Sequence, residues 1–88
     1  MSDELSLAAM AVLRTLLRRK GRPASGDDIL ERIFATTSEI PIDNERVCAA
    51  VTELETKGFA VTVRTAPPEG YDFSSVKLTP EGEALGRG

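Results

Sequence analysis

The stretch LETKGFAVTVR, residues 54–64, decides the fold because a helical pattern ends within it and a strand pattern begins. Gly58 marks the boundary, since glycine adopts the left-handed conformation that ends helices without a penalty from Cβ. The alternation that follows is typical of a half-buried strand. It predicts that one alternate set of side chains faces the core: Phe59, Val61 and Val63. The other set is expected to face outward: Ala60, Thr62 and Arg64.

Three helices are expected before this strand. Apolar residues at helical spacing predict the first over residues 2–19. The second starts after Ser25, an N-cap residue with Asp28 in the position of a capping box. The third covers residues 44–57 after an N-cap at Asp43. In order, the expected buried faces are Leu5, Ala9, Val12, Leu13 and Leu16; Ile29, Leu30, Ile33 and Phe34; and Val47, Ala50, Val51 and Leu54.

The segment after the strand predicts a hairpin and a last short helix. TAPPEGYD, residues 65–72, contains two prolines and a glycine and should form a loop. Residues 75–79 return as a strand with Val76 and Leu78 inward and Lys77 outward. Thr79 then caps a helix that has Pro80 at its first position. The predicted fold is α+β, mostly α: a winged helix-turn-helix with three helices, a two-stranded β-wing and a short C-terminal segment.

Two quoted segments carry a resemblance to a known family. VTELETKGFAVTVR together with VKLTPEGEAL resembles the recognition helix, wing and post-wing segment of bacterial winged helix-turn-helix regulators, such as the multiple-antibiotic-resistance and phenolic-acid repressor groups. The resemblance covers residues 5–85 and implies a DNA-binding regulator. Two features depart from the family pattern: the long connection ATTSEIPID at residues 35–43, and the absence of the long extra helices by which those regulators dimerise.

Composition narrows the classes of function. With 88 residues and 41% hydrophobic content, residues 1–88 are expected to form a single domain. Cys48 is the only cysteine and is expected to be a packed thiol. The chain has no histidine and no phosphate-binding glycine loop, so we expect no enzyme, no cofactor and no metal site. The apolar run at residues 5–17 is too short to span a bilayer, which predicts a cytoplasmic protein without membrane association.

Charge is distributed unevenly along the chain. The net charge is −3, yet residues 1–24 hold five basic and two acidic groups. Basic groups that neutralise phosphates supply most non-specific DNA affinity, so the end of the first helix offers candidate phosphate contacts. These are Arg18, Arg19, Lys20 and Arg22. The alternative is that these cations only compensate the dipole at the C-terminal end of the helix.

The third helix is the candidate for reading DNA. A turn of about 100° per residue places Glu45, Ala49, Thr52 and Thr56 opposite its buried face, with Arg46, Glu53 and Lys57 on the flanks. Thr and Ala can approach base edges or thymine methyl groups, and basic residues can contact phosphates. The candidate DNA-binding residues on the helix and wing are Arg46, Ala49, Thr52, Thr56, Lys57, Arg64 and Lys77.

Two functions are therefore weighed. The first is a small DNA-binding transcriptional regulator whose partner is double-stranded DNA. The second is a winged-helix module for protein–protein interaction or dimerisation that binds no DNA, which the acidic total charge favours. Met10 and Leu17 widen the apolar face of the first helix and predict a homodimer interface there.

Overall fold

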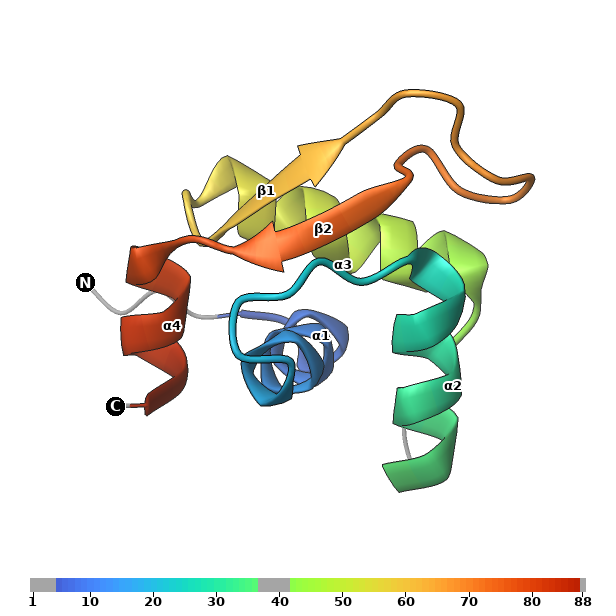
Figure 1. The fold of residues 1–88 in the computed structure, drawn as a ribbon. Coiled ribbons are helices and arrows are strands. Elements are labelled where there is room, and N and C mark those ends of the chain that lie inside the picture. Colours follow the sequence, from blue (N-terminus) through green and yellow to red (C-terminus); the bar gives the residue numbers. More distant parts are fainter. Residues whose placement is uncertain (1–4, 37–41, 88) are drawn as a thin grey trace.

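The protein is α+β and mostly helical, and its described residues form four helices and one two-stranded antiparallel sheet (Figure 1). The computed structural model describes residues 5–36 and 42–87. Residues 37–41, which form most of the predicted connection between the second and third helices, lie outside the described residues. The elements are α1 (Leu7–Arg18), α2 (Gly26–Thr36), α3 (Asn44–Thr56), β1 (Ala60–Val63), β2 (Ser75–Leu78) and α4 (Pro80–Arg87). This arrangement is compatible with a winged-helix layout.

Side-chain caps fix where the helices begin. The Ala9 N–H donates to Ser6 Oγ at 3.1 Å, so α1 starts at Leu7, and the predicted start at residue 2 was wrong. The capping box is confirmed, because the Asp28 N–H donates to Ser25 Oγ at 3.1 Å and the Ser25 N–H donates to Asp28 Oδ2 at 3.2 Å.

The third and fourth helices also begin at the predicted caps. The Arg46 N–H donates to Asp43 Oδ1 at 2.9 Å, which caps α3. The Gly82 N–H donates to Thr79 Oγ1 at 3.1 Å, and Pro80 occupies the first position of α4. Both predicted starts are confirmed.

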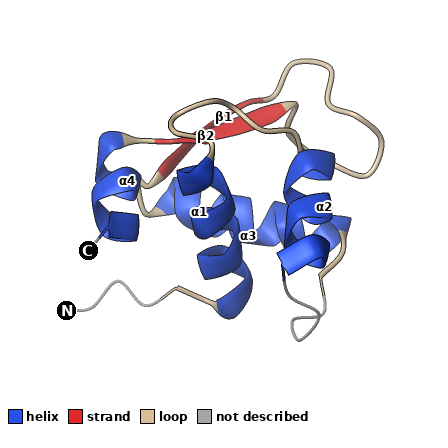
Figure 2. Cartoon of the chain, turned by 60° about the horizontal axis from the view of Figure 1, so that its bottom comes forward, coloured by secondary structure: helices blue, strands red, loops and turns tan. Residues whose placement is uncertain are grey.

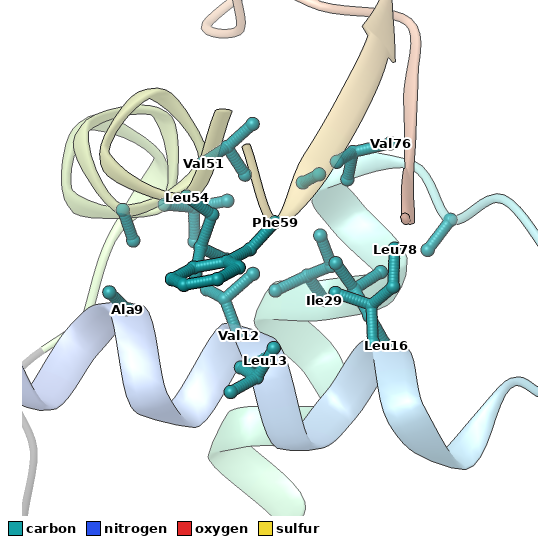
Figure 3. Packing of buried hydrophobic residues seen from close by; sticks show 14 of the residues in the cluster. Ala9, Val12, Leu13, Leu16, Ile29, Val51, Leu54, Phe59, Val76 and Leu78 are labelled. Atoms are coloured by element: carbon teal, nitrogen blue, oxygen red, sulfur yellow. The ribbon is translucent and has the colours of Figure 1, made fainter. Parts of the chain in front are cut away.

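Gly58 ends α3 as predicted, with a φ of +82°. The Gly58 N–H donates to Glu55 O at 3.0 Å, and the Phe59 N–H donates to Leu54 O at 2.9 Å. This pair of bonds is a Schellman motif, which commonly brings the residue after the glycine onto the last turn of the helix. Figure 3 shows Phe59 beside Leu54 in the core.

The predicted phase of β1 was wrong. Ala60 pairs with Leu78 and Thr62 with Val76, so these four residues share the inner face of the hairpin. Val61 and Val63 therefore face outward and are 45% and 53% exposed. The inward positions Val76 and Leu78 and the outward Lys77 of β2 are confirmed. The error arose because Phe59 belongs to the end of the helix, so an alternation counted through it is displaced by one residue.

Ala24, in the connection between α1 and α2, forms an isolated antiparallel bridge with Val76 of β2. Its N–H donates to Val76 O at 2.9 Å, and the Val76 N–H donates to Ala24 O at 2.9 Å. Strand β2 is therefore paired on both sides, and β1 is an edge. The sequence pattern gave no sign of this bridge because a single bridging residue has no period.

The core lies between α1, α2, α3 and the inner face of the hairpin (Figure 3). The predicted faces of α1 and α3 are confirmed, except that Leu5 is only partly buried. On α2, Ile29 and Ile33 are buried, but Phe34 is 60% exposed, so its predicted burial was wrong. Phe34 lies five residues after Ile29, a separation that turns its side chain away from the core.

Helix α4 packs beside α1 (Figure 2). A Cβ atom on Gly86 would lie 2.9 Å from Leu17 Cδ2, so the side chain of Leu17 contacts α4 and is only partly exposed. Met10 is 38% exposed and Leu7 is 71% exposed. Part of the apolar surface of α1 is thus covered within the chain. Within the described residues, none of the helices has the length and apolar character needed to cross a membrane.

Candidate nucleic-acid interface

The outer face of α3 is solvent-exposed as predicted. Its centre is formed by Glu45 and by the small side chains of Ala49, Thr52 and Thr56, and basic residues lie at its margin. The exposed residues of this face are Glu45, Arg46, Ala49, Thr52, Thr56 and Lys57. The face is therefore open to a partner along the length of the helix.

Glu53, predicted to flank this face, is partly buried and bonded to the start of α1. The Ser6 N–H donates to Glu53 Oε2 at 2.9 Å, and Ser6 Oγ donates to Glu53 Oε1 at 2.8 Å. The N-terminal end of a helix carries partial positive charge, which offsets a carboxylate placed there. Glu53 thus contributes less negative charge to the exposed face than its position in the sequence suggests.

Glu55 is likewise engaged inside the chain. Thr62 Oγ1 donates to Glu55 Oε2 at 2.7 Å, and Arg64 Nη2 donates to Glu55 Oε1 at 2.6 Å. These hydrogen bonds lower the pKa of the Glu55 carboxyl below its ordinary value, and the bond from Thr62 has the larger effect. The bonds also connect the last turn of α3 to β1.

Arg64 does not lie on the outward face of the wing, contrary to the prediction. Besides Glu55, its guanidinium contacts Asp72: Nη1 donates to Asp72 O at 3.0 Å and lies 3.3 Å from Asp72 Oδ2. Side-chain hydrogen bonding to Glu55 is the main cause that raises the pKa of Arg64. The outer face of the hairpin instead presents Lys77 opposite Val61.

The loop after β1 is attached to the N-terminal ends of α2 and α3 (Figure 1). Asn44 Nδ2 donates to Gly70 O at 2.9 Å, and Tyr71 Oη donates to Asp27 Oδ1 at 2.9 Å. Burial and the bond to Asp27 raise the pKa of Tyr71 to about 12. The loop therefore closes one flank of α3 near its start and leaves the outer face uncovered.

Cys48 lies on this closed flank. Its side chain is partly buried, and Sγ is 3.9 Å from Gly70 O. Burial raises the pKa of the thiol, which lowers the fraction of reactive thiolate at neutral pH. This environment agrees with the predicted packed thiol.

The basic end of α1 is not brought together with the outer face of α3. The bond between α1 and α3 is made at the start of α1, by Ser6. The helix has 12 residues, so Arg18 lies about 18 Å farther along it. Figure 3 shows α3 over the first half of α1, near Ala9, while Leu16 lies farther along toward Leu78.

Arg18 and Arg19 face α2 rather than α3. Arg19 Nη2 donates to Pro23 O at 3.1 Å and lies 3.9 Å from Asp28 Oδ2. Arg18 is in the last turn of α1, where the alternative interpretation expects a cation to offset the helix dipole. The groove here has a volume of about 390 Å³, and its charged lining residues are Arg18, Arg19, Asp28, Glu31 and Arg32. Lys20 and Arg22 are exposed in the following turn.

Sequence reasoning missed the partners that determine the charge of this surface. Ser6 is 47 residues from Glu53, and Asp72 is eight residues from Arg64. Neither pair lies at a helical or strand repeat, so no periodic pattern connects them. The placement of Thr62 next to Glu55 follows from the true phase of β1, which the sequence did not reveal.

No family model matches the chain, and no curated protein or solved structure was found that resembles it. The resemblance to bacterial winged helix-turn-helix regulators therefore stays a prediction.

Proposed function

We propose that the protein is a small winged-helix DNA-binding protein that acts in transcription regulation. One observation carries the proposal: the outer face of α3 is uncovered, while Glu53 and Glu55, two of the three acids on that helix, are bonded within the chain. Repulsion of phosphates by α3 is thereby reduced. A helix with small side chains at its centre and basic residues at its margin fits a major groove.

In this proposal α3 supplies the contacts to bases. Ala49, Thr52 and Thr56 approach base edges and thymine methyl groups, because their side chains are short enough for the backbone to come close. Arg46, in the first turn of α3, is placed where recognition helices contact bases or phosphates. Glu45, beside it, favours a position where it accepts a hydrogen bond from cytosine.

Phosphate contacts come from few residues. Arg46, Lys57 and Lys77 are exposed on α3 and the wing. The guanidinium of Arg64 is bonded to the carboxylates of Glu55 and Asp72. Each phosphate contact contributes about −0.9 to the slope of log affinity against log salt concentration, so three contacts give about −3. Such a protein binds non-specific DNA weakly, which agrees with its net charge of −3.

A homodimer through α1 is part of the proposal, because two copies would present two α3 helices to a two-fold DNA site. Leu7 and Met10 on α1 are exposed, and Leu17 is partly covered by α4, so the interface would centre on the first half of the helix. Sedimentation equilibrium of the parent and of Met10→Gln tests it. A weaker dimer in the variant is expected, and a monomeric parent at high concentration would refute the dimer.

The test of DNA binding is a titration of a labelled pool of random duplexes at roughly 50 mM salt, repeated at higher salt. We expect Lys57→Ala and Lys77→Ala each to lower affinity for all sequences and to reduce the salt slope by about one. Arg46→Ala is expected also to relax preference at one or two base positions of a selected duplex, at a cost of about 1–3 kcal/mol.

The matched control is Arg18→Ala, which removes a cation at the far end of α1 and should leave the affinity and the salt slope unchanged. A parent protein that shows no duplex binding above background would overturn the proposal. So would a set of α3 and wing variants that bind as tightly as the parent. If Arg18→Ala lowered the affinity for DNA as much as Lys57→Ala, the DNA would bind to another face of the protein.

A further inference from the structure

A second groove, away from the outer face of α3, has an apolar lining and an acidic rim. It lies between α2, the start of α3 and the loop after β1, and has a volume of about 330 Å³. We call it the acid-rimmed groove and define it by six of its lining residues: Leu30, Phe34 and Tyr71, which are apolar or aromatic, and Asp27, Asp43 and Glu69, which are acidic.

The apolar part of the groove is accessible from outside. Phe34 is the most exposed aromatic side chain of the described residues, and Leu30 and Tyr71 are partly buried beside the groove. An exposed phenylalanine that lines a concave surface is typical of a site that a partner covers. The groove is therefore an open surface on which a partner can contact Phe34.

The acidic part of the groove determines the charge of that partner. Asp27 Oδ1 accepts a hydrogen bond from Tyr71 Oη, and Asp43 Oδ1 accepts one from the Arg46 N–H. Each carboxylate keeps its second oxygen as an acceptor. Glu69 is exposed at the rim. None of the described lining residues is a lysine or an arginine. The N-terminal ends of α2 and α3 offset part of the charge of Asp27 and Asp43, whereas Glu69 lies in the loop and is not at a helix end.

We propose that the acid-rimmed groove is a docking site for a basic segment of a partner protein, in which an arginine or lysine lies next to an aliphatic residue. The aliphatic side chain packs against Phe34 and Leu30. The cation contacts the carboxylates of the rim and the face of an aromatic ring, two interactions that favour arginine in particular. DNA is repelled by the same carboxylates, so this site is separate from the proposed DNA contact and does not depend on it.

Three fluorescein-labelled hexapeptides test the proposal by anisotropy with the whole chain. One alternates arginine and leucine, the second alternates glutamate and leucine, and the third alternates arginine and serine. We expect the arginine–leucine peptide to bind at least about tenfold more tightly than either of the others, since each control lacks one of the two required features. Equal binding of all three, or of the two arginine peptides, would overturn the proposal.

Two variants locate the binding. Phe34→Ala removes the exposed ring and Glu69→Lys reverses one rim charge; each should lower the affinity for the arginine–leucine peptide by about tenfold. Val63→Ala is the matched control, because Val63 is an exposed apolar residue on the outer face of the hairpin. If Phe34→Ala and Val63→Ala bind alike, the groove is not the site.

Tyr71 supplies an independent signal, because it is the only tyrosine and the chain has no tryptophan. Binding of an unlabelled peptide free of aromatic residues should change the fluorescence of Tyr71 in the parent and in Val63→Ala. Binding without that change would place the peptide elsewhere. Self-association of the parent that Phe34→Ala abolishes would show that a second copy occupies the groove, which also contradicts the proposed partner.

Discussion

The carboxylate of Glu53 on α3 accepts two hydrogen bonds from Ser6, the residue that caps α1. Ser6 Oγ accepts from the Ala9 N–H at 3.1 Å while it donates to Glu53, so one hydroxyl both starts a helix and joins it to another. The relation fixes where α1 begins relative to α3 and holds the carboxylate of Glu53 at the N-terminal end of α1.

The first prediction concerns the strength of this link. Ser6→Ala is expected to destabilise the fold by about 1–2 kcal/mol through loss of the cap. In a double-mutant cycle with Glu53→Ala, the coupling energy should be about 0.5–1.5 kcal/mol. Urea unfolding of the four proteins measures it, with Glu31→Ala on α2 as a control expected within about 0.5 kcal/mol of the parent. Additive single effects would mean that the bond contributes nothing.

The second prediction concerns acid stability. Because the pKa of Glu55 is lowered in the folded state, its contribution to stability is present above the ordinary carboxyl pKa of about 4.3 and is lost as pH falls through the lowered value. Glu55→Gln should be less stable at neutral pH and should lose less stability on acidification. Urea midpoints measured from pH 6 to about pH 3 test this. Parallel pH profiles for parent and variant would contradict it.

The third prediction uses two glycines of the same helix. A Cβ on Gly82 would overlap the carbonyl oxygen of Phe59, a backbone atom that cannot move aside, whereas a Cβ on Gly86 would meet only the flexible end of Leu17. Gly82→Ala should destabilise the fold by about 1–3 kcal/mol. Gly86→Ala should change stability by less than about 1 kcal/mol, since alanine also favours the helix. Thermal unfolding of both variants tests this difference. Equal unfolding midpoints would refute the close packing of α4 against Phe59.

The fourth prediction concerns the thiol of Cys48. Burial raises its pKa, so its reaction with a disulfide reagent at neutral pH should be slower than that of a free cysteine peptide. The rate should rise to the peptide value in urea, where the thiol is solvated. A folded protein that reacts as fast as the peptide would indicate an exposed, reactive thiol and would contradict the packed one.

The fifth prediction concerns Tyr71, whose titration can be followed alone in the ultraviolet because it is the only tyrosine. The midpoint of its titration should lie at about pH 12 in the folded protein and at about pH 10 in urea. The stability that the raised pKa of Tyr71 reflects is fully present below about pH 10 and is lost as the pH rises through the pKa of the folded state. Asp27→Asn should lower the folded midpoint, because it removes the charged acceptor. A folded midpoint near 10 would contradict the buried contact.

Local chemistry determined a large part of this fold. Ser25, Asp43 and Thr79 accept backbone N–H groups three residues ahead, and Gly58 adopts the conformation that ends α3. Each of these interactions spans only a few residues, so the sequence was sufficient to predict it. The exposed face of α3 followed from the helical repeat for the same reason.

Tertiary contacts decided the rest. The phase of β1 depends on which residues pair with β2, and the charge of the candidate interface depends on Ser6 and Arg64 reaching acids on α3. Phe34 is 60% exposed, although the spacing of apolar residues predicted it on the buried face of α2 together with Ile29 and Ile33. These features arise between segments far apart in the chain, where spacing in the sequence carries no information about distance in the folded protein.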